Sequence, residues 1–293
     1  MTKIVPHLWF DKQAKEAAEC YAAVFDDSRV LSAATLSDTP SGNIEIVNVV
    51  LCGQPFQFLS AGPLFQFNPS ISFQVDCATS EECQRLWSAL VEGGAVLMPL
   101  GVYPFSEQYG WLQDRYGVSW QIALIAGAKQ RITPTLMFTG AQHGKAKEAI
   151  DVYTGLFPNA TLLSSVYYGK DADAPAVEGT VKHATFTLDG LSFAAIDSAH
   201  DHGFSFNESI SFMVYCQTQA EIDHYWNALS AVPEAEQCGW LKDAYGVSWQ
   251  IVPEAMDAMM SDPDSAAVAR VTEAFLAMKK FDLAALEKAY TGG

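Results

Sequence analysis

Two glutamines interrupt otherwise apolar strands, one near the end of each half of the chain. The segment Asp114–Ile122 reads DRYGVSWQI and returns as DAYGVSWQI at Asp243–Ile251. An Asp followed three residues later by Gly is typical of a turn, because Asp bonds its own backbone and Gly accepts positive φ. A tight hairpin does not explain Gln121, since an inward-facing amide needs a polar partner. Gln121 is therefore the first candidate site residue.

The elements that must position this motif occur twice, because the two halves align nearly end to end. Ile4–Phe10 matches Ile132–Phe138 as an opening strand, and the apolar spacing after Ala14 and after Ala146 predicts a helix in each half. Further strands are expected at 44–52 and 56–59 in the first half, and at 181–188 and 193–196 in the second.

A second strand and helix follow in each half. Thr79 precedes Glu82 by three residues, and Thr218 precedes Glu221 in the same way, so both helices should begin with a capping box. Each half therefore consists of two βαβββ-like units. The segment 93–105, between the helix and the final hairpin, has no full counterpart in the second half, which has lost about one strand.

The chain turns helical after Pro253. Asp262 is expected to cap a helix whose first residue is Pro263, and Asp282 to cap a short final helix. The apolar face of such a tail either packs on its own domains or pairs with a second copy, giving a homodimer through the C-terminal helices.

Composition limits the partners. Lys and Arg number 17 against 34 Asp and Glu, and a net charge of −17 disfavours nucleic acid and an anionic membrane surface. No apolar run approaches the roughly 18 residues of a transmembrane helix, and no signal sequence is recognisable, so a cytoplasmic protein is expected. The six cysteines form no C-x-x-C pair and are expected to be reduced. Neither a nucleophile elbow nor a P-loop occurs.

These motifs resemble a known family. The motifs are Trp9-Phe10 near the start, Phe-Asn-x-Ser-Ile-Ser-Phe in the middle of each half, and Gly-Trp-Leu followed by Asp-x-x-Gly-Val-Ser-Trp-Gln at each end. In these motifs the chain resembles the PhnB-like branch of the vicinal oxygen chelate superfamily. That superfamily is the glyoxalase, bleomycin-resistance and extradiol dioxygenase group. The resemblance covers about residues 3 to 253. It implies an α+β fold of two tandem domains, 1–128 and 129–253, each of paired βαβββ units, and a helical tail at 254–293.

The resemblance does not settle an activity. PhnB-like chains are often labelled as resembling 3-demethylubiquinone-9 3-methyltransferase. A nucleotide-like methyl donor on a Rossmann-type sheet would call for a G-x-G-x-x-G that follows a strand and opens a helix, and this sequence has none.

The resemblance also implies where a site would lie. Metal enzymes of the superfamily place one ligand on the first and one on the last strand of each unit. The matching positions in the first half are His7, Gln57, Ser70 or Ser72, and Gln121. Only His7 is a good ligand, because amide and hydroxyl oxygens replace carboxylates poorly. The matching positions in the second half are poorer still: Thr135, Ala194, Ser211 and Gln250. We therefore expect no metal and no other cofactor.

What remains in the first half is a cup of aromatic and hydrogen-bonding side chains, which is typical of a small-molecule pocket. The expected ligand-binding residues are His7, Trp9, Gln57, Ser72, Trp111 and Gln121. In a contrasting interpretation, His7 and Gln121 bond each other inside a filled cup. The sequence leaves the catalytic residues unknown.

Three hypotheses about function stay open. The first is a metal-free small-molecule binder or a member without surviving catalysis. The second is a metal-dependent glyoxalase-like lyase or isomerase with its site around His7 and Gln121. The third is a structural or regulatory dimer built on the tail.

Two further expectations concern single positions. Because strand residues alternate sides, Trp120 and Trp249 should be buried while Gln121 and Gln250 point to the opposite face. The cluster Asp197, His200, Asp201 and His202 is interpreted as a solvated turn.

Overall fold

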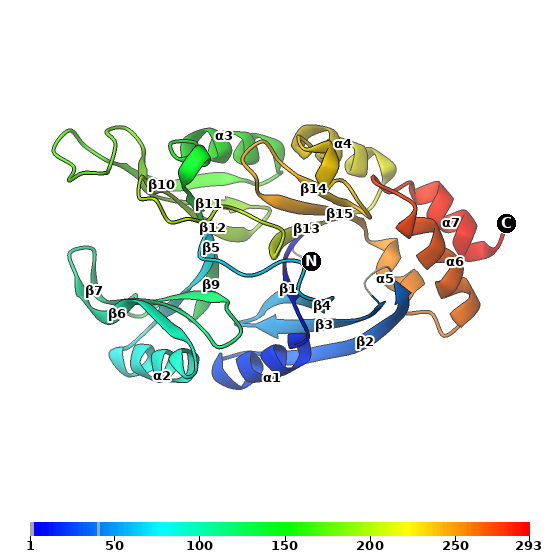
Figure 1. Ribbon diagram of the computed structural model, residues 1–293, viewed down its shortest axis with the longest axis horizontal. Coiled ribbons are helices and arrows are strands. Elements are labelled where there is room, and N and C mark those ends of the chain that lie inside the picture. Colours follow the sequence, from blue (N-terminus) through cyan, green and yellow to red (C-terminus); the bar gives the residue numbers. More distant parts are fainter. Residues whose placement is uncertain (1–2, 40–41) are drawn as a thin grey trace. The chain divides into compact units, whose positions relative to one another are not determined.

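The computed structural model describes residues 3–39 and 42–293 and has an α+β fold (Figure 1). The chain forms two compact units, which are described separately below. The larger unit is Pro6–Ile210, and the smaller one joins the described residues up to Val5 to Ser211–Gly293. The boundary at Ile210 lies inside the second sequence repeat, and the ranges 1–128 and 129–253 stay a prediction.

The order of elements follows the repeat. The first repeat contains β1 (Ile4–Phe10), α1 (Ala14–Val24), β2 (Arg29–Thr39), β3 (Gly42–Leu51), β4 (Gln54–Ser60), β5 (Ile71–Cys77), α2 (Ser80–Val91), β6 (Ala95–Tyr103), β7 (Ser106–Gln113) and β8 (Ser119–Leu124). The second contains β9 (Arg131–Phe138), α3 (Ala146–Leu156), β10 (Thr161–Tyr167), β11 (Val181–Leu188), β12 (Leu191–Asp197), β13 (Ile210–Cys216), α4 (Gln219–Leu229), β14 (Trp240–Lys242) and β15 (Ser248–Pro253). The tail contains α5 (Ala255–Met260), α6 (Ser265–Leu276) and α7 (Leu283–Thr291).

This order confirms the βαβββ-like units. Three units are complete, and the described part of the last unit has only β13, α4, β14 and β15, so the loss of about one strand is confirmed. Strands β2 and β10 are additions to the strands expected from the sequence. Each lies at the end of its sheet order, and β10 is largely exposed along its length, so neither shows the alternation by which strands are recognised.

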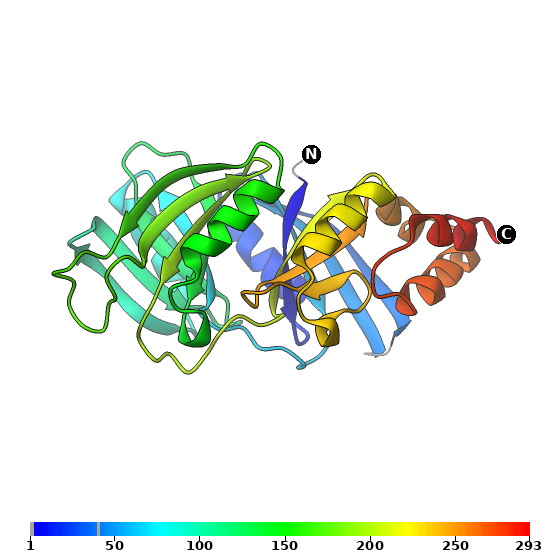
Figure 2. The same ribbon diagram turned by 90° about the horizontal axis from the view of Figure 1, so that it is seen from above.

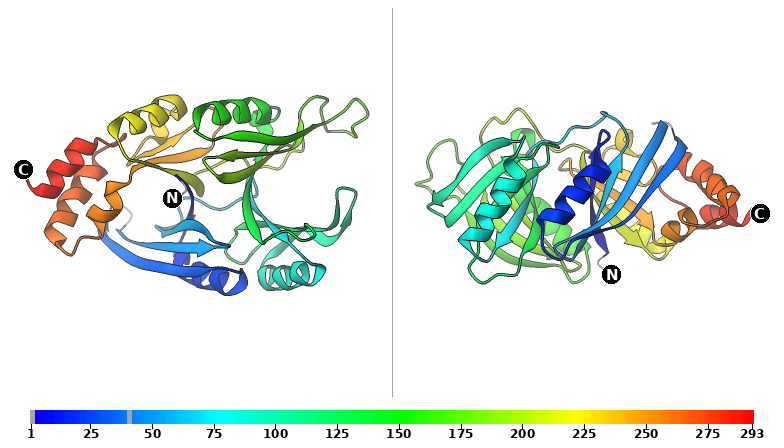
Figure 3. Two further views of the ribbon diagram at one scale, coloured as in Figure 1. Left: turned by 180° about the vertical axis from the view of Figure 1, so that it is seen from behind. Right: turned by 90° about the horizontal axis from the view of Figure 1, so that it is seen from below.

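The larger unit contains a sheet of eight strands in the order β10-β11-β12-β9-β5-β8-β7-β6. At its centre β5 and β9 pair antiparallel from Ile71 opposite Leu136 to Asp76 opposite Arg131. The sheet therefore combines the second βαβββ unit of the first repeat with the first unit of the second repeat. Figures 1 and 3 show β10 to β12 and β6 to β8 as two arms of one curved sheet. In the same unit, β1, β4, β3 and β2 are hydrogen-bonded in that order.

Helices α2 and α3 cover one face of the eight-stranded sheet, which we call the outer face (Figure 1). Its side chains include the fully buried Phe73, Trp120 and Leu112. Gly110 on β7 points to the same side, where a Cβ would come within 2.5 Å of the Trp87 ring of α2. The residues that alternate with these lie on the opposite side, which we call the inner face.

The repeated Asp-x-x-Gly-Val-Ser-Trp motif is a turn locked to a buried indole. Asp114 accepts hydrogen bonds from the backbone N–H of Val118 at 3.0 Å and from Trp120 Nε1 at 2.8 Å. Asp243 accepts the same bonds from Val247 at 3.0 Å and from Trp249 at 2.9 Å. Burial raises the pKa of the Asp114 carboxyl, and these hydrogen bonds oppose that shift. The motif thus fixes where each final strand begins and which way its residues point.

The parity expected for this motif is confirmed. Trp120 and Trp249 are each only 1% exposed. Gln121 and Gln250 face the other way, because their amides donate to Ser72 and to Ser211 on the neighbouring strands. The threonine caps are confirmed too: Thr79 Oγ1 and Thr218 Oγ1 each accept a backbone N–H at 3.2 Å, from residues 82 and 221. The returning bonds of Glu82 and Glu221 come from the N–H groups of residues 78 and 217, one position before the cap residues of a capping box.

The tail packs against the strands of the smaller unit, to which it belongs. Figure 2 shows α6 and α7 side by side. Their apolar side chains join a core with residues of β13 and β15; the buried members are Val5, Met213, Val252, Met259, Val271, Phe281 and Leu286. The tail also meets the shortened βαβββ unit: Cys238 N–H donates to Met278 O at 2.8 Å, and Gly239 N–H to Lys279 O at 2.7 Å. Packing on its own unit is therefore found, and pairing with a second copy stays a prediction.

One expected helix start in the tail is wrong. Asp264, not Asp262, caps α6 by accepting the Ala266 N–H at 3.0 Å. Asp262 instead accepts the Asp264 N–H at 2.7 Å, so it shapes the turn before the helix. The cap at Asp282 is confirmed by its bond from Ala285 N–H at 3.0 Å.

Two smaller findings complete the fold. All six cysteines are free thiols. Within the described ranges, no helix has the length and apolar character needed to cross a membrane.

Replacing Trp120 or Trp249 by Ala should lower the free energy of unfolding by about 3 to 5 kcal/mol, because each removes a fully buried indole and leaves a cavity. Denaturant titration measures the loss. Trp111→Ala is the matched control, since Trp111 is only half-buried and should cost less. If the variants of Trp120 and Trp249 were as stable as the parent, the assignment of both indoles to the buried side of their strands would be wrong.

Candidate functional site

The inner face of the eight-stranded sheet carries a buried polar network around Gln121. Gln121 Nε2 donates to Ser72 Oγ at 2.6 Å, and Gln121 Oε1 accepts from the Tyr109 hydroxyl at 2.8 Å. Trp111 is the strand partner of Gln121 on β7 and donates from Nε1 to Ser119 Oγ at 2.8 Å. We call Ser72, Tyr109, Trp111 and Gln121 the Gln121 cluster. Three of the predicted site residues are thereby brought together.

The other three predicted residues lie on β1 and β4. His7 is the strand partner of Gln57, whose Nε2 donates to Asn48 Oδ1 on β3 at 3.1 Å. Asn48 Nδ2 in turn donates to Ser32 Oγ on β2 at 3.0 Å. Trp9 is half-buried and donates from Nε1 to a backbone carbonyl, at residue 62, at 2.8 Å. A second polar row thus crosses β1, β4, β3 and β2.

The six predicted residues therefore divide between two sheets of the larger unit. Ser72, Trp111 and Gln121 share one sheet, and the other three share the second. Gln121 finds hydrogen-bond partners on its own sheet, in Ser72 and Tyr109. Adjacent strands in the eight-stranded sheet come from both repeats, so the strands that follow β5 in this sheet are β9 and β12, not β1 and β4.

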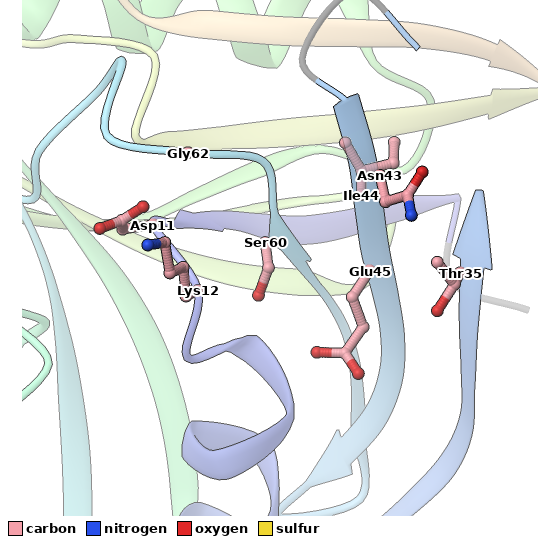
Figure 4. Close-up of a pocket in the computed structure, with 8 residues that line it drawn as sticks. All are labelled: Asp11, Lys12, Thr35, Asn43, Ile44, Glu45, Ser60 and Gly62. Atoms are coloured by element: carbon pink, nitrogen blue, oxygen red, sulfur yellow. The ribbon is translucent and has the colours of Figure 1, made fainter. Parts of the chain in front are cut away.

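Two surface hollows among the described residues of the larger unit are lined by none of the predicted site residues. The first, of about 260 Å³, lies at the start of α1 and is drawn in Figure 4. Its lining residues are Asp11, Lys12, Thr35, Asn43, Ile44, Glu45, Ser60 and Gly62. Ser60 Oγ there accepts the N–H of Ala14, so it caps the helix. The second hollow, of about 560 Å³, is formed mainly by the loop 166–176 with Lys182 and residues 198–200.

His7 is held in its neutral form. Complete burial lowers its pKa to about 3, because an imidazolium there would lose its hydration. A neutral imidazole offers one donor and one acceptor nitrogen and can act as a hydrogen-bonding group at neutral pH. It cannot serve there as a general acid, since the protonated form is not populated.

The donor set does not fit a catalytic divalent cation. The strand partner of His7 is the amide Gln57, and Gln121 is bonded to the hydroxyl of Ser72. Over residues 3–39 and 42–293, no three His, Cys, Asp or Glu side chains come together as a metal-binding group. Amide and hydroxyl oxygens lack the negative charge that holds such ions, so no reaction step through a metal is derived.

Tyr109 and Asn48 are site neighbours that sequence reasoning missed. Tyr109 could have been found, because it stands two residues before Trp111 and alternation places both on the face of Gln121. Asn48 could not, since its place beside Gln57 follows from strand register. Burial raises the pKa of Tyr109, so its hydroxyl stays protonated and donates a hydrogen bond to Gln121 Oε1.

The interpretation of Asp197 as part of a solvated turn is wrong. Asp197 is buried, its Oδ1 accepts the N–H of Gly144 at 2.7 Å, and its Oδ2 accepts the N–H of Val181 at 2.8 Å. It ties the start of α3 to β11. His200 and Asp201 are exposed, as expected of that turn.

Comparison with known proteins agrees with this architecture. The model of the family described as 3-demethylubiquinone-9 3-methyltransferase matches residues 2–123 and again 130–252. The PhnB protein from Bacillus cereus is 36% identical over 41% of this chain and 98% of its own, with a TM-score of 0.39. A Pseudomonas aeruginosa protein is 23% identical over 41% of this chain and 95% of its own, with a TM-score of 0.36.

Glyoxalase I from Zea mays matches over nearly the full length: 89% of this chain and 98% of its own, at 10% identity and a TM-score of 0.55. At that identity the match concerns the fold alone. No curated protein matches the chain. The chain thus shares its fold with glyoxalase I, and the family model that matches both repeats confirms the family resemblance seen in the sequence. The chain belongs to the 3-demethylubiquinone-9 3-methyltransferase family.

Acid should destabilise the protein partly through His7. Its folded pKa of about 3 lies below the ordinary value of 6.5, so its contribution is present above pH 6.5 and is lost as pH falls toward 3. At pH 5 the loss should reach about 2 kcal/mol. His7→Gln should remove that share of the pH dependence, measured by denaturant titration between pH 7 and 5. His200→Gln, at an exposed position, is the control, and equal pH profiles for parent and His7→Gln would contradict the argument.

Proposed function

We propose that this protein is a metal-free small-molecule-binding member of the PhnB-like group, and that its ligand contacts the Gln121 cluster. The observation that carries the proposal is the bonded series Tyr109–Gln121–Ser72 on the inner face beside Trp111. An indole next to an oriented amide and hydroxyls can hold a planar polar molecule by contact with its face and by directional hydrogen bonds. His7, Trp9 and Gln57 form the second candidate patch, on the other sheet.

Binding is favoured over acid–base catalysis by the kinds of groups present. Amide, hydroxyl and indole groups do not exchange protons near neutral pH. The one imidazole among the predicted residues, His7, has a pKa of about 3. Methyl transfer is not proposed, because the sequence lacks the glycine-rich strand–helix turn expected for a nucleotide-like methyl donor.

A glyoxalase-like lyase or isomerase is the rival hypothesis and differs in needing a metal. Protein purified without chelators should contain well under one zinc, nickel, manganese or iron per chain by elemental analysis, because His7 has only amides and hydroxyls as co-ligands. A stoichiometric metal that is lost in His7→Ala would favour the lyase instead.

Gln121→Ala should weaken binding far more than Gln250→Ala. The two amides make the same bond, to Ser72 at 2.6 Å and to Ser211 at 2.9 Å, so the second variant is a matched control for lost structure. Losing a directional bond inside a pocket costs about 1 to 3 kcal/mol, or roughly 5- to 150-fold in affinity.

The measurement is titration of one compound, found by thermal-shift screening, against the parent and both variants. Equal losses in the two variants, or a loss only in Gln250→Ala, would end the proposal that the ligand contacts the Gln121 cluster.

A further inference from the structure

A row of small side chains crosses the inner face from the first repeat into the second. Ser72 on β5 is opposite Thr135 on β9, and Thr135 is paired with Ala194 on β12. Ala194 is opposite Thr185 on β11, which is opposite Ser164 on β10. Paired residues on neighbouring strands point to the same side, so these five form one strip, which we call the small-residue row.

Larger side chains border this row. On one side Gln74 follows Ser72 along β5, and beyond the β5 end of the row Gln121 and Trp111 continue the face on β8 and β7. On the other side Met137 and Ile196 are paired across β9 and β12. The row is therefore a strip of low side chains with Gln74 on one side and Met137 and Ile196 on the other, and a flat molecule matches such a strip better than a bulky one.

Two hydroxyl groups on this face have no hydrogen-bond partner. Thr133 is 6% exposed and Thr135 is 3% exposed, and within the described residues neither Oγ1 atom finds a donor or acceptor. A buried polar group without a partner costs about 1 to 3 kcal/mol, and native proteins retain few of them. Thr135 lies in the small-residue row, and Thr133 lies opposite Gln74 in its border.

The charged pair next to the two threonines is already satisfied. Arg131 donates to Asp76 Oδ2 at 2.8 Å, and Gln74 Nε2 donates to Asp76 Oδ1 at 2.9 Å. A charged ligand would exchange its hydration for amides and hydroxyls without gaining a counter-charge, which is unfavourable in a buried place.

We infer that the small-residue row binds a planar, uncharged ligand with a carboxamide-like group, and that Thr133 and Thr135 hydrogen-bond this group. The inference rests on the proposed function and extends it, because it assigns part of the site to the second repeat and names the ligand chemistry. A primary amide presents an acceptor and a donor at its two ends, and a hydroxyl can pair with either. The ring of the ligand then lies over Ser72, on the side of Thr135 that leads toward Gln121. Neither threonine oxygen is accessible to solvent, so binding includes a shift of a bordering side chain such as Gln74.

The first test measures stability without any ligand. Thr133→Val and Thr135→Val should keep or raise the melting temperature, because each removes an unpartnered buried hydroxyl at nearly constant volume. The matched control is Thr139→Val: Thr139 is 1% exposed, but its hydroxyl donates to the His200 carbonyl at 3.2 Å, so this variant should melt lower. If Thr133→Val and Thr135→Val lose as much as Thr139→Val, their hydroxyls have partners within the protein, for instance after rotation of Gln74, and the inference falls.

The second test measures binding of three flat probes that differ in charge: benzamide, benzoate and benzamidine. Ligand-observed NMR titration of the full-length protein should show benzamide binding at least tenfold more tightly than the two ions. Thr135→Val should weaken benzamide binding about tenfold, as expected for one buried hydrogen bond. No benzamide binding, or a preference for either ion, would overturn the inference.

Gln121→Ala separates the two proposals. If benzamide binding falls in Gln121→Ala but is unchanged in Thr133→Val and Thr135→Val, the ligand contacts the Gln121 cluster without the threonines. The proposed function then stands, and the inference about the second repeat is wrong.

Discussion

The antiparallel pairing of β5 with β9 is the interaction on which the candidate site depends. Backbone hydrogen bonds from residues 71–76 to residues 131–136 join a strand of the first repeat to a strand of the second. Without this pairing, β5 and β9 would each present an unsatisfied edge. With it, the register sets Ser72 opposite Thr135, so the polar positions of both repeats meet on one inner face while Phe73 and Leu136 face the helices.

Because of this pairing, one sequence repeat does not correspond to one sheet. Each repeat contributes one βαβββ unit to the eight-stranded sheet, so a site on that sheet belongs to both repeats. The cup expected from the sequence drew six residues from the first repeat alone, and the structure divides them between two sheets. His7 and Gln57 lie beside Asn48, while Gln121 and Ser72 lie near Thr135.

The two copies of the Trp-Gln motif make the same hydrogen bond and the same strand pairing but have different surroundings. Gln250 bonds to Ser211 and is paired with Trp240, as Gln121 bonds to Ser72 and is paired with Trp111. The first copy adds the hydroxyl of Tyr109, which stands two residues before Trp111; two residues before Trp240 the chain has Cys238 instead. In the smaller unit, carbonyl groups of the tail accept hydrogen bonds from the N–H groups of residues 238 and 239 at this position. The difference between the copies therefore lies in the neighbouring strand and the tail, not in the glutamine itself.

The sequence by itself determined the features that depend on local physics. Asp114, Gly117 and Trp120 specify a turn and a buried indole, and their spacing alone predicts the parity of Gln121. Helical spacing and the capping boxes locate the helices in the same way, and the repeat together with its family motifs gave the fold class. Only the tertiary structure decided which strands from distant parts of the chain are neighbours. That choice depends on nonlocal hydrogen bonding and register, which leave no periodic signal in the sequence. For this reason Gln121 could be selected from its motif, whereas its separation from His7 and the unpartnered hydroxyls of Thr133 and Thr135 became visible only in the folded chain.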